Sequence, residues 1–309
     1  MQPDMPALPP TIGRPPPADL LLIGVGIVAV STSGPLMAAV AAPAIAVAFW
    51  RNALGVAAIT PFAVGRRRAE LRALTRREVR WALMSGVLLA AHFATWVPSL
   101  RFTSVASATA IVATQPVWVA LVARAMGHDV PRRTWVGIAL SLLAVLVLTG
   151  VDFSIEPRAL LGDGLALLGG MFAALYTVAG AEVRRTVSTT SYTWICYSVA
   201  AAGLLLGAVA FGVDLWGYDR TTWVQLLALT AGAQLLGHSV FNLVLRSTSA
   251  TVVSLALLLE VPGAALIAAV WLGQSPPLAA IPAALLLLLG LAIVLFDRPS
   301  DVAAAIPAE

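Results

Sequence analysis

The sequence has 309 residues, of which 60 % are hydrophobic and 11 % are charged. Soluble globular proteins average about 45–50 % apolar and about 25 % charged residues, because much of a folded surface must stay in contact with water. The composition therefore excludes disordered, fibrous and nucleic-acid-binding classes, argues against a soluble enzyme, and predicts an all-α integral membrane protein. A membrane-spanning helix needs about 20 apolar residues, so ten such helices would use about 200 residues and leave about 100 for loops and tails.

The chain begins with a proline-rich segment, residues 1–18, which predicts a disordered tail. Ten apolar segments follow, and residues 298–309 form a second tail. We predict that the apolar segments are transmembrane helices at residues 19–40, 43–64, 80–99, 103–125, 133–150, 161–183, 190–212, 223–245, 249–272 and 277–296. We expect small residues to let the sixth helix approach its neighbours closely, namely Gly162, Gly164, Gly169 and Gly170. The single cysteine, Cys196, lies in an apolar segment and predicts a buried packing residue.

The basic residues are all arginines, and most of them lie in loops on one side of the predicted membrane protein. One side carries the seven arginines between Arg66 and Arg80, followed by Arg124, Arg132, Arg133, Arg184, Arg185 and Arg246. The loops on the other side carry only Arg101, Arg158 and Arg220. Basic loops stay on the cytoplasmic side, so the pattern predicts a multi-pass protein of the cell membrane with both termini in the cytoplasm.

The second half of the sequence repeats the first. Leu100-Arg101-Phe102-Thr103-Ser104 returns as Leu245-Arg246-Ser247-Thr248-Ser249, and the same offset places Gln115 opposite Glu260. Five predicted helices separate each pair, so the second copy enters the membrane from the opposite side. We therefore predict two inverted five-helix repeats, residues 19–150 and 161–297, that move about a central site.

Two charged residues lie far from the ends of predicted helices, where an ionisable side chain is costly and needs a partner or a wet cavity. Glu260 lies in the middle of the ninth predicted helix, and Pro262 is expected to loosen the backbone beside it. Its carboxyl group is a candidate for proton coupling or for contact with a substrate amine; the alternative is a helix-to-helix hydrogen bond. Arg51 in the second helix either holds a carboxylate or extends to the outer interface.

Polar stripes on two further helices also point to a cavity. His92 shares a helix face with Trp96 and Ser99, and His238 shares one with Gln234 and Asn242 at four-residue spacing. Packing histidines with hydrogen-bonded partners are the alternative interpretation. We predict that the cavity is lined by Arg51, His92, Trp96, Gln115, Tyr176, His238, Asn242 and Glu260.

The sequence shows no enzyme motif. It lacks a Gly-x-Ser-x-Gly element with a partner histidine and a His-Glu-x-x-His helix, and without lysine it cannot form a Walker loop. Three residues, His92, His238 and Glu260, could in principle hold a metal ion, but their spacing matches no standard site. We therefore expect no catalytic residues, no metal and no cofactor.

The sequence resembles the EamA family of the drug/metabolite transporter superfamily from about residue 20 to 297. The resemblance rests on Phe49-Trp50-Arg51, Ser104-Val-Ala-Ser-Ala108, Gln115-Pro116, Ala174-Leu175-Tyr176-Thr177-Val178, His238-Ser-Val-Phe-Asn242-Leu-Val-Leu-Arg246, and Ser249-Ala-Thr-Val-Val-Ser254 leading to Glu260. It implies two inverted repeats and export of small metabolites, often amino acids or toxic amphiphiles. The sequence departs from the family pattern at Glu260-Val261-Pro262, Gly127-His128 and Gly273-Gln274, and at Ser31–Pro35 in the first helix.

The sequence thus favours a transporter of the cell membrane that exports small metabolites, with Glu260 as the proton-coupling candidate. The alternatives are an exporter of amphiphilic drugs, a membrane enzyme acting on lipid-linked substrates, or a membrane protein that transports nothing. The expected partners are a small-molecule substrate and membrane lipid, without nucleic acid. Dimerisation through peripheral helices stays open.

Overall fold

The structure is a computed structural model that describes residues 15–99, 102, 103, 108, 111–149, 156–272 and 280–295. Within these residues every regular element is a helix, as the sequence predicts. Several predicted features lie outside the described residues: most of the first tail, the second tail, the Leu100–Arg101 part of the repeated motif, most of Ser104–Ala108, and Gly273-Gln274.

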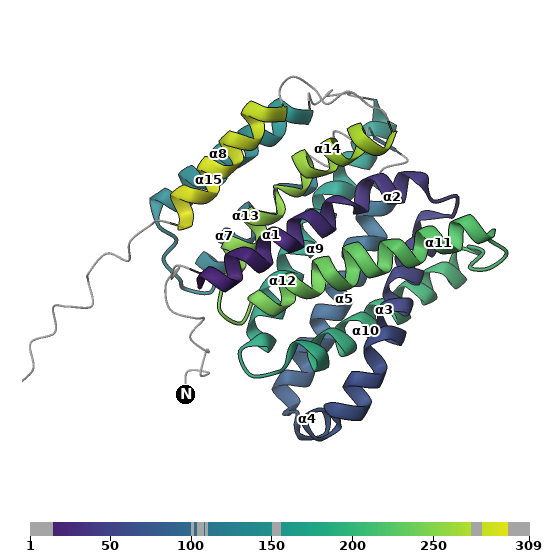
Figure 1. The fold of residues 1–309 in the computed structure, drawn as a ribbon. Coiled ribbons are helices and arrows are strands. Elements are labelled where there is room, and N and C mark those ends of the chain that lie inside the picture. The colour runs from purple at the N-terminus through teal and green to yellow at the C-terminus, as the bar shows by residue number, and fades with distance from the viewer. Residues whose placement is uncertain are drawn as a thin grey trace, which may run out of the picture.

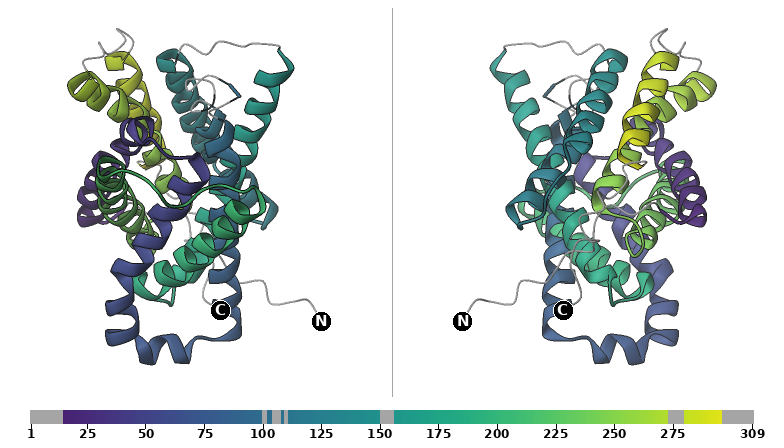
Figure 2. Two further views of the ribbon diagram at one scale, coloured as in Figure 1. Left: turned by 90° about the vertical axis from the view of Figure 1, so that its right-hand side faces the viewer. Right: turned by 90° about the vertical axis from the view of Figure 1, so that its left-hand side faces the viewer.

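The first half of the bundle contains helices α1 to α8. They are α1 (Pro17–Ser31), α2 (Ser33–Ala39), α3 (Ala44–Arg66), α4 (Arg68–Ala73), α5 (Arg76–Ser99), α7 (Gln115–Ala125) and α8 (Arg132–Thr149). The short α4 joins α3 to α5 at one end of the molecule, which we call the α4 end (Figure 2). The predicted helix at 19–40 is divided at Thr32 into α1 and α2.

The second half contains α9 to α15. They are α9 (Pro157–Arg184), α10 (Thr189–Ala210), α11 (Arg220–Leu229), the π-helix η1 (Thr230–His238), α12 (Ser239–Val244), α13 (Ala250–Leu257), α14 (Glu260–Leu272) and α15 (Ala280–Leu295). The predicted helix at 223–245 is therefore a continuous segment whose middle is a π-helix. A π-helix turn holds more residues than an α-helix turn, so the four-residue spacing assumed for the polar stripe around His238 does not hold there.

Two helices are interrupted at equivalent positions of the two halves. Residues 113 and 114 form a turn directly before α7, and residues 258 and 259 form a turn between α13 and α14. Gln115 therefore begins α7, and Glu260 begins α14. The predicted position of Glu260 in mid-helix is wrong, because Pro262 cannot donate a backbone hydrogen bond and the preceding turn closes with shorter-range bonds such as Val261 N to Leu258 O.

The helices pack in pairs around two main apolar clusters. Helix α5 packs against α9 and α10, α3 against α10, and α1 against η1, α12 and α14. Figure 1 shows α8 and α15 side by side at one edge of the bundle, in agreement with their packing. A buried cluster containing Phe93, Tyr192 and Tyr197 fills the space between α3, α5 and α10.

Small residues allow the closest approaches around α9. A Cβ on Gly162 would lie 2.6 Å from the backbone nitrogen of Thr103, and one on Gly169 would lie 2.9 Å from Cβ of Trp96. A Cβ on Gly170 would lie 3.0 Å from the carbonyl oxygen of Val112. A Cβ on Gly164 would meet no described atom within 4 Å. The interpretation that Gly164 serves close packing is therefore wrong.

The outer surface is apolar, as expected of a bundle surrounded by lipid. Large hydrophobic side chains such as Leu21, Val209 and Ile281 are strongly exposed. Five helical segments in the described part of the chain are long and apolar enough to cross a membrane: Ala44–Arg66, Arg76–Ser99, Pro157–Arg184, Thr189–Ala210 and Arg220–Val244. The all-α membrane class is therefore confirmed, and the total of ten spanning helices stays a prediction.

Candidate functional site

Arg51 lies in the middle of the bundle, on α3, with 1 % of its surface exposed. Its Nε donates a hydrogen bond of 2.9 Å to Oε1 of Gln234, and its guanidinium lies 4.7 Å from the ring centre of Phe93. Among the described residues it forms no ion pair within 4.0 Å. The alternative in which Arg51 extends to the outer interface is therefore wrong, because the side chain is enclosed by protein.

A polar relay fixes the orientation of Arg51. Gln234 on η1 accepts from Arg51 through Oε1 and donates through Nε2 to Oδ1 of Asn52 at 3.1 Å. Asn52 in turn donates to the carbonyl of Ala48 one turn earlier in α3. Each amide thus has a defined donor and acceptor end, and the guanidinium is held in one orientation relative to η1.

Glu260 and His238 lie near this guanidinium. Both are close enough to Arg51 to interact with it electrostatically, and His238 also interacts with His92. Both side chains are partly buried. Glu260 is held in place through its backbone, since its carbonyl accepts from Oγ of Ser31 on α1 at 3.5 Å. The turn before α14 thus brings Glu260 towards the buried cation.

His92 and Trp96 form an aromatic stack on α5. Their ring centres are 5.5 Å apart and the planes are inclined by 11°. Nδ1 of His92 lies 2.9 Å from the carbonyl of Gly169 on α9, so Nδ1 carries the proton and donates this hydrogen bond. Ser99, on the same helix face, is fully buried. The predicted stripe on this helix therefore faces protein, and Nε1 of Trp96 has no hydrogen-bond partner.

The remaining predicted residues come from α7, α9 and α12. Tyr176 on α9 donates to Oδ1 of Asn242 on α12 at 2.9 Å, which leaves Nδ2 of Asn242 without a partner. Gln115 on α7 donates to Oγ1 of Thr177 at 3.0 Å. Arg51 is within electrostatic range of Tyr176 but not in direct contact with it. Gln115 is thus joined to α9 beside Tyr176 rather than to Arg51.

The structure therefore brings most of the predicted lining residues to one buried centre. We call this group of side chains the Arg51 centre: Arg51, His92, Trp96, Tyr176, Gln234, His238, Asn242 and Glu260. Tyr197 of α10 borders it, because its hydroxyl group lies 3.2 Å from Oγ of Ser239 and 3.5 Å from the carbonyl of Gln234. The predicted lining set does not include Tyr197, and only the fold shows that it borders this centre.

A pocket of about 200 Å³ lies next to the Arg51 centre, towards the α4 end. Its walls come from α3, α10 and the η1–α12 segment, and its lining residues are Ile59, Phe62, Thr189, Thr190, Thr193, Leu235 and Ser239. Ser239 belongs both to the pocket wall and to the contact with Tyr197.

Comparison with known proteins supports the family resemblance. The EamA-like transporter family matches residues 17–150 and again residues 160–296. The chain belongs to the EamA-like transporter family. A solved crystal structure shares the fold with a TM-score of 0.75 and 20 % identity, covering 89 % of this chain and 96 % of that chain. A search of the curated proteins finds no match.

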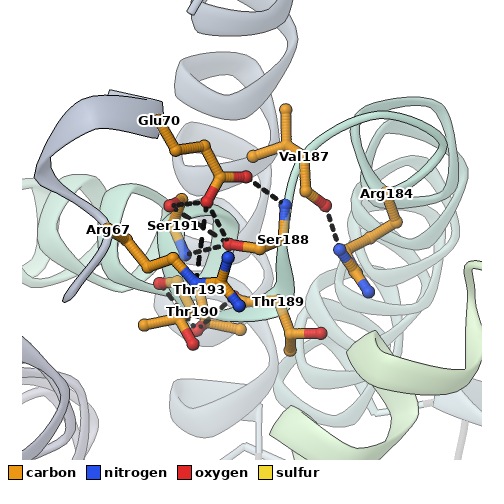
Figure 3. A network of polar contacts seen from close by, with 9 residues as sticks. All are labelled: Arg67, Glu70, Arg184, Val187, Ser188, Thr189, Thr190, Ser191 and Thr193. Atoms are coloured by element: carbon orange, nitrogen blue, oxygen red, sulfur yellow. Dashed lines mark hydrogen bonds and ion pairs between the residues drawn. The ribbon is translucent and has the colours of Figure 1, made fainter. Parts of the chain in front are cut away.

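In this family member the α4 end carries a second polar network, which sequence patterns do not reveal (Figure 3). Glu70 on α4 accepts from the backbone nitrogen of Ser188 at 2.6 Å, from Oγ of Ser188 at 2.6 Å and from Oγ of Ser191 at 2.9 Å. Ser188 is the N-cap of α10, so Glu70 adds a negative charge at the start of that helix. The network joins α4, in the first matched segment, to α10, in the second.

The hydrogen bonds also hold Glu70 in its charged form. Partial burial raises the pKa of Glu70, but the hydrogen bonds from Ser188 and Ser191 and the charge of Arg67 lower it more, so the pKa lies below its ordinary value of 4.5. Further contacts nearby link the same two parts of the chain. Arg77 pairs with Glu182 at 2.7 Å, and Thr186 donates to Glu78 at 2.6 Å.

Arg184 is a further buried arginine that sequence patterns place in a loop. Only 2 % of its surface is exposed, and its Nε donates to the carbonyl of Asn242 at 2.8 Å. It also donates to the carbonyl of Val187, as Figure 3 shows. Arg184 therefore connects the α4-end network to the helix that carries Asn242. In the sequence, Arg184 stands next to Arg185 and is informative only for the orientation in the membrane. A sequence alone does not distinguish a buried arginine at a helix end from an exposed one.

Proposed function

We propose that the protein is a secondary transporter of the cell membrane that exports small metabolites, amino acids or related compounds, by alternating access to the Arg51 centre. One observation carries the proposal: polar and charged side chains from both family-matched segments converge in the interior of an apolar helix bundle. Charged groups at such depth are costly and are typical of substrate or ion pathways. The helix interruptions before Gln115 and Glu260 fit this role, because discontinuous helices form transporter binding sites.

Arg51 itself is enclosed in this structure, so a solute reaches its guanidinium only after the surrounding helices move apart. The contacts between Glu70 and α10 are suited to close the α4 end, since they cross between the two matched segments. The arginines of the α3–α5 connection support a cytoplasmic location for this end, and for both termini, by the positive-inside rule. The α4-end network would then act as a cytoplasmic gate.

Glu260 is the candidate that couples transport to protons. Of the described carboxylates it is the one within electrostatic range of Arg51, and no ion pair to a described residue fixes it in the charged state. A carboxyl group in such surroundings can take up a proton when the cation is engaged elsewhere and release it when the cation is free. Proton uptake and solute binding would thereby alternate at one centre.

The proposal is tested by uptake into proteoliposomes that contain the purified full-length protein. Labelled amino acids and nucleobases form one panel, and cationic amphiphilic dyes form a second. We expect saturable uptake of at least one small metabolite above the level of protein-free vesicles. Uptake restricted to the dyes would contradict metabolite export in favour of drug export, and no uptake from either panel would contradict the proposed transport function.

A further inference from the structure

Within the described part of the chain, three buried side-chain groups of the Arg51 centre have no hydrogen-bond partner: Nη2 of Arg51, Nε1 of Trp96 and Nδ2 of Asn242. All three are nitrogen donors, and none of them can accept a hydrogen bond. The amide of Asn242 is oriented by Tyr176, which donates to its oxygen, so the nitrogen is the free end. A buried donor without a partner is unfavourable, so each of these groups is complementary to a ligand that brings an acceptor oxygen.

The guanidinium of Arg51 presents one free edge. Its Nε is used by Gln234, and one face lies over Phe93. Nη1 has only a contact of 4.0 Å to the sulfur of Met37, and Nη2 has no partner. The Nη1–Nη2 edge is therefore available, in an orientation already fixed by the relay through Gln234 and Asn52. Two parallel N–H groups on a planar fork match the two oxygens of a carboxylate.

The charge of the centre limits which anion fits. Arg51 contributes one positive charge, and Glu260 lies within electrostatic range of it. A phosphate monoester carries about −1.5 to −2 charges near neutral pH and would be repelled by Glu260 with only one cation to balance it. A single carboxylate carries one charge, which the free edge of Arg51 can neutralise.

We propose that the Arg51 centre is a subsite for one carboxylate group, bound by the Nη edge of Arg51, and that the transported solutes are organic monocarboxylates. This inference rests on the proposed transport function and assigns its substrate class. Nδ2 of Asn242 and Nε1 of Trp96 are further unpartnered donors among the described side chains of the Arg51 centre. The stacked rings of His92 and Trp96 provide an apolar wall for the body of the solute.

The experiment compares carboxylates with their amides, which keep the shape and lose the negative charge. The purified full-length protein is titrated with leucine and leucinamide, with phenylacetate and phenylacetamide, and with the other common amino acids, while its thermal unfolding midpoint is followed. We expect saturable stabilisation by at least one carboxylate. The matching amide should bind about 10- to 100-fold more weakly, because a charge-assisted hydrogen bond to Arg51 is lost.

Variants assign the preference to Arg51. In Arg51→Gln the new amide can still donate to Gln234, so the relay is kept while the charge is lost, and carboxylates should bind no better than amides. Arg51→Lys should retain a weaker preference for the carboxylate. Arg66→Gln is the matched control, because Arg66 lies on the same helix and also stands over a phenylalanine, Phe62, but is exposed at the α4 end. It should bind like the wild type.

The outcomes separate this inference from transport itself. Equal binding of carboxylate and amide, an unchanged preference in Arg51→Gln, or no binding of any carboxylate would overturn the subsite. Carboxylate-selective binding without flux in proteoliposomes would support the subsite and contradict the transport function. Flux of neutral or cationic solutes without any carboxylate preference would support the transport function and contradict the subsite.

Discussion

The central residue of this protein is an arginine whose environment is polar but not balanced by an adjacent carboxylate. Breaking a buried ion pair by removing one partner typically costs about 3–5 kcal/mol, because the remaining charge is left uncompensated in a low-dielectric interior. Arg51 is instead held by Gln234 and by the ring of Phe93, and Glu260 interacts with it only from beyond ion-pair distance. This arrangement leaves the cation free to change partners, as a coupling mechanism requires.

The proposed coupling role of Glu260 predicts a specific defect in Glu260→Gln. This variant cannot exchange a proton at residue 260, so uptake driven by a pH gradient should fall to the level measured without a gradient. Exchange of labelled for unlabelled solute, which needs no net proton movement, should persist. Gln115 at the equivalent position of the first half indicates that a glutamine side chain is tolerated at the start of such a helix.

Both fluxes are measured in the same proteoliposome preparation, so the exchange reaction is the control for folding and insertion. Normal accumulation of solute by Glu260→Gln on a pH gradient would exclude Glu260 as the coupling residue. Loss of both fluxes together would also contradict the separate coupling role, since it would place Glu260 in solute binding or in the conformational change itself.

For single residues, the sequence identifies polar side chains within the apolar segments more readily than polar side chains at the α4 end. Arg51, His92 and Asn242 stand out because charged or amide side chains are rare in apolar segments. Glu70 and Arg184 do not stand out, since each lies in an arginine-rich region that the positive-inside rule already explains. The contacts of Glu70 with Ser188 and Ser191 join residues more than a hundred positions apart, which no local pattern encodes.

At the scale of helices, glycine decides how closely α9 approaches α5. Gly169→Val should destabilise the protein by about 1–3 kcal/mol, because its first side-chain carbon would lie 2.9 Å from Cβ of Trp96. Gly164→Val on the same helix should have little effect, since no atom lies within 4 Å of its position. The thermal unfolding midpoint of the two variants checks this difference, and equal midpoints would contradict the packing described here.

The α4-end network predicts that Glu70→Gln loosens the contact between α4 and α10. Cys196, the single cysteine, is buried on α10 between Ser85 and Tyr192, so its reaction with a maleimide reports separation of α5 and α10. We expect roughly 2- to 10-fold faster labelling in Glu70→Gln, because neutral hydrogen bonds replace charge-assisted ones. Arg67→Gln should label like the wild type, since its exposed ion pair of 3.9 Å contributes little.

The same network has a defined dependence on pH. The pKa of Glu70 is lower in the folded protein than its ordinary value of 4.5, so its contribution to stability is present above pH 4.5 and is lost as the pH falls through the folded pKa. The difference in unfolding midpoint between the wild type and Glu70→Gln should therefore be constant near neutral pH and shrink in acid. A difference that grows as the pH falls would contradict the network.

Helix interruptions show where local sequence is informative. Pro116 and Pro262 lie just after the turns at residues 113–114 and 258–259, and a proline that cannot donate to the preceding turn explains each interruption. The π-helix at Thr230–His238 has no such signal, because it contains no proline. Its effect on the spacing of Gln234, His238 and Asn242 therefore follows only from the tertiary structure.

At the scale of the whole molecule, the arginine distribution predicts the orientation in the membrane. We expect a reporter that works only in the cytoplasm to give a signal when it is fused after Glu309. A reporter that works only outside the cell should give none at the same position. The physical reason is the concentration of arginines in the α3–α5 connection, which disfavours its translocation. A signal from the external reporter would overturn the orientation and would place the Glu70 network on the outer side.

The central claim is alternating access to the Arg51 centre, and counterflow in proteoliposomes tests it most directly. Vesicles are preloaded with an unlabelled solute that the protein binds, and entry of the labelled solute is compared with entry into empty vesicles. A carrier that crosses the membrane faster with bound solute than without it produces a transient accumulation of label in preloaded vesicles. This account predicts such an accumulation for the wild type and none for Arg51→Gln. Equal entry into preloaded and empty vesicles would contradict alternating access and would indicate a passive pathway instead.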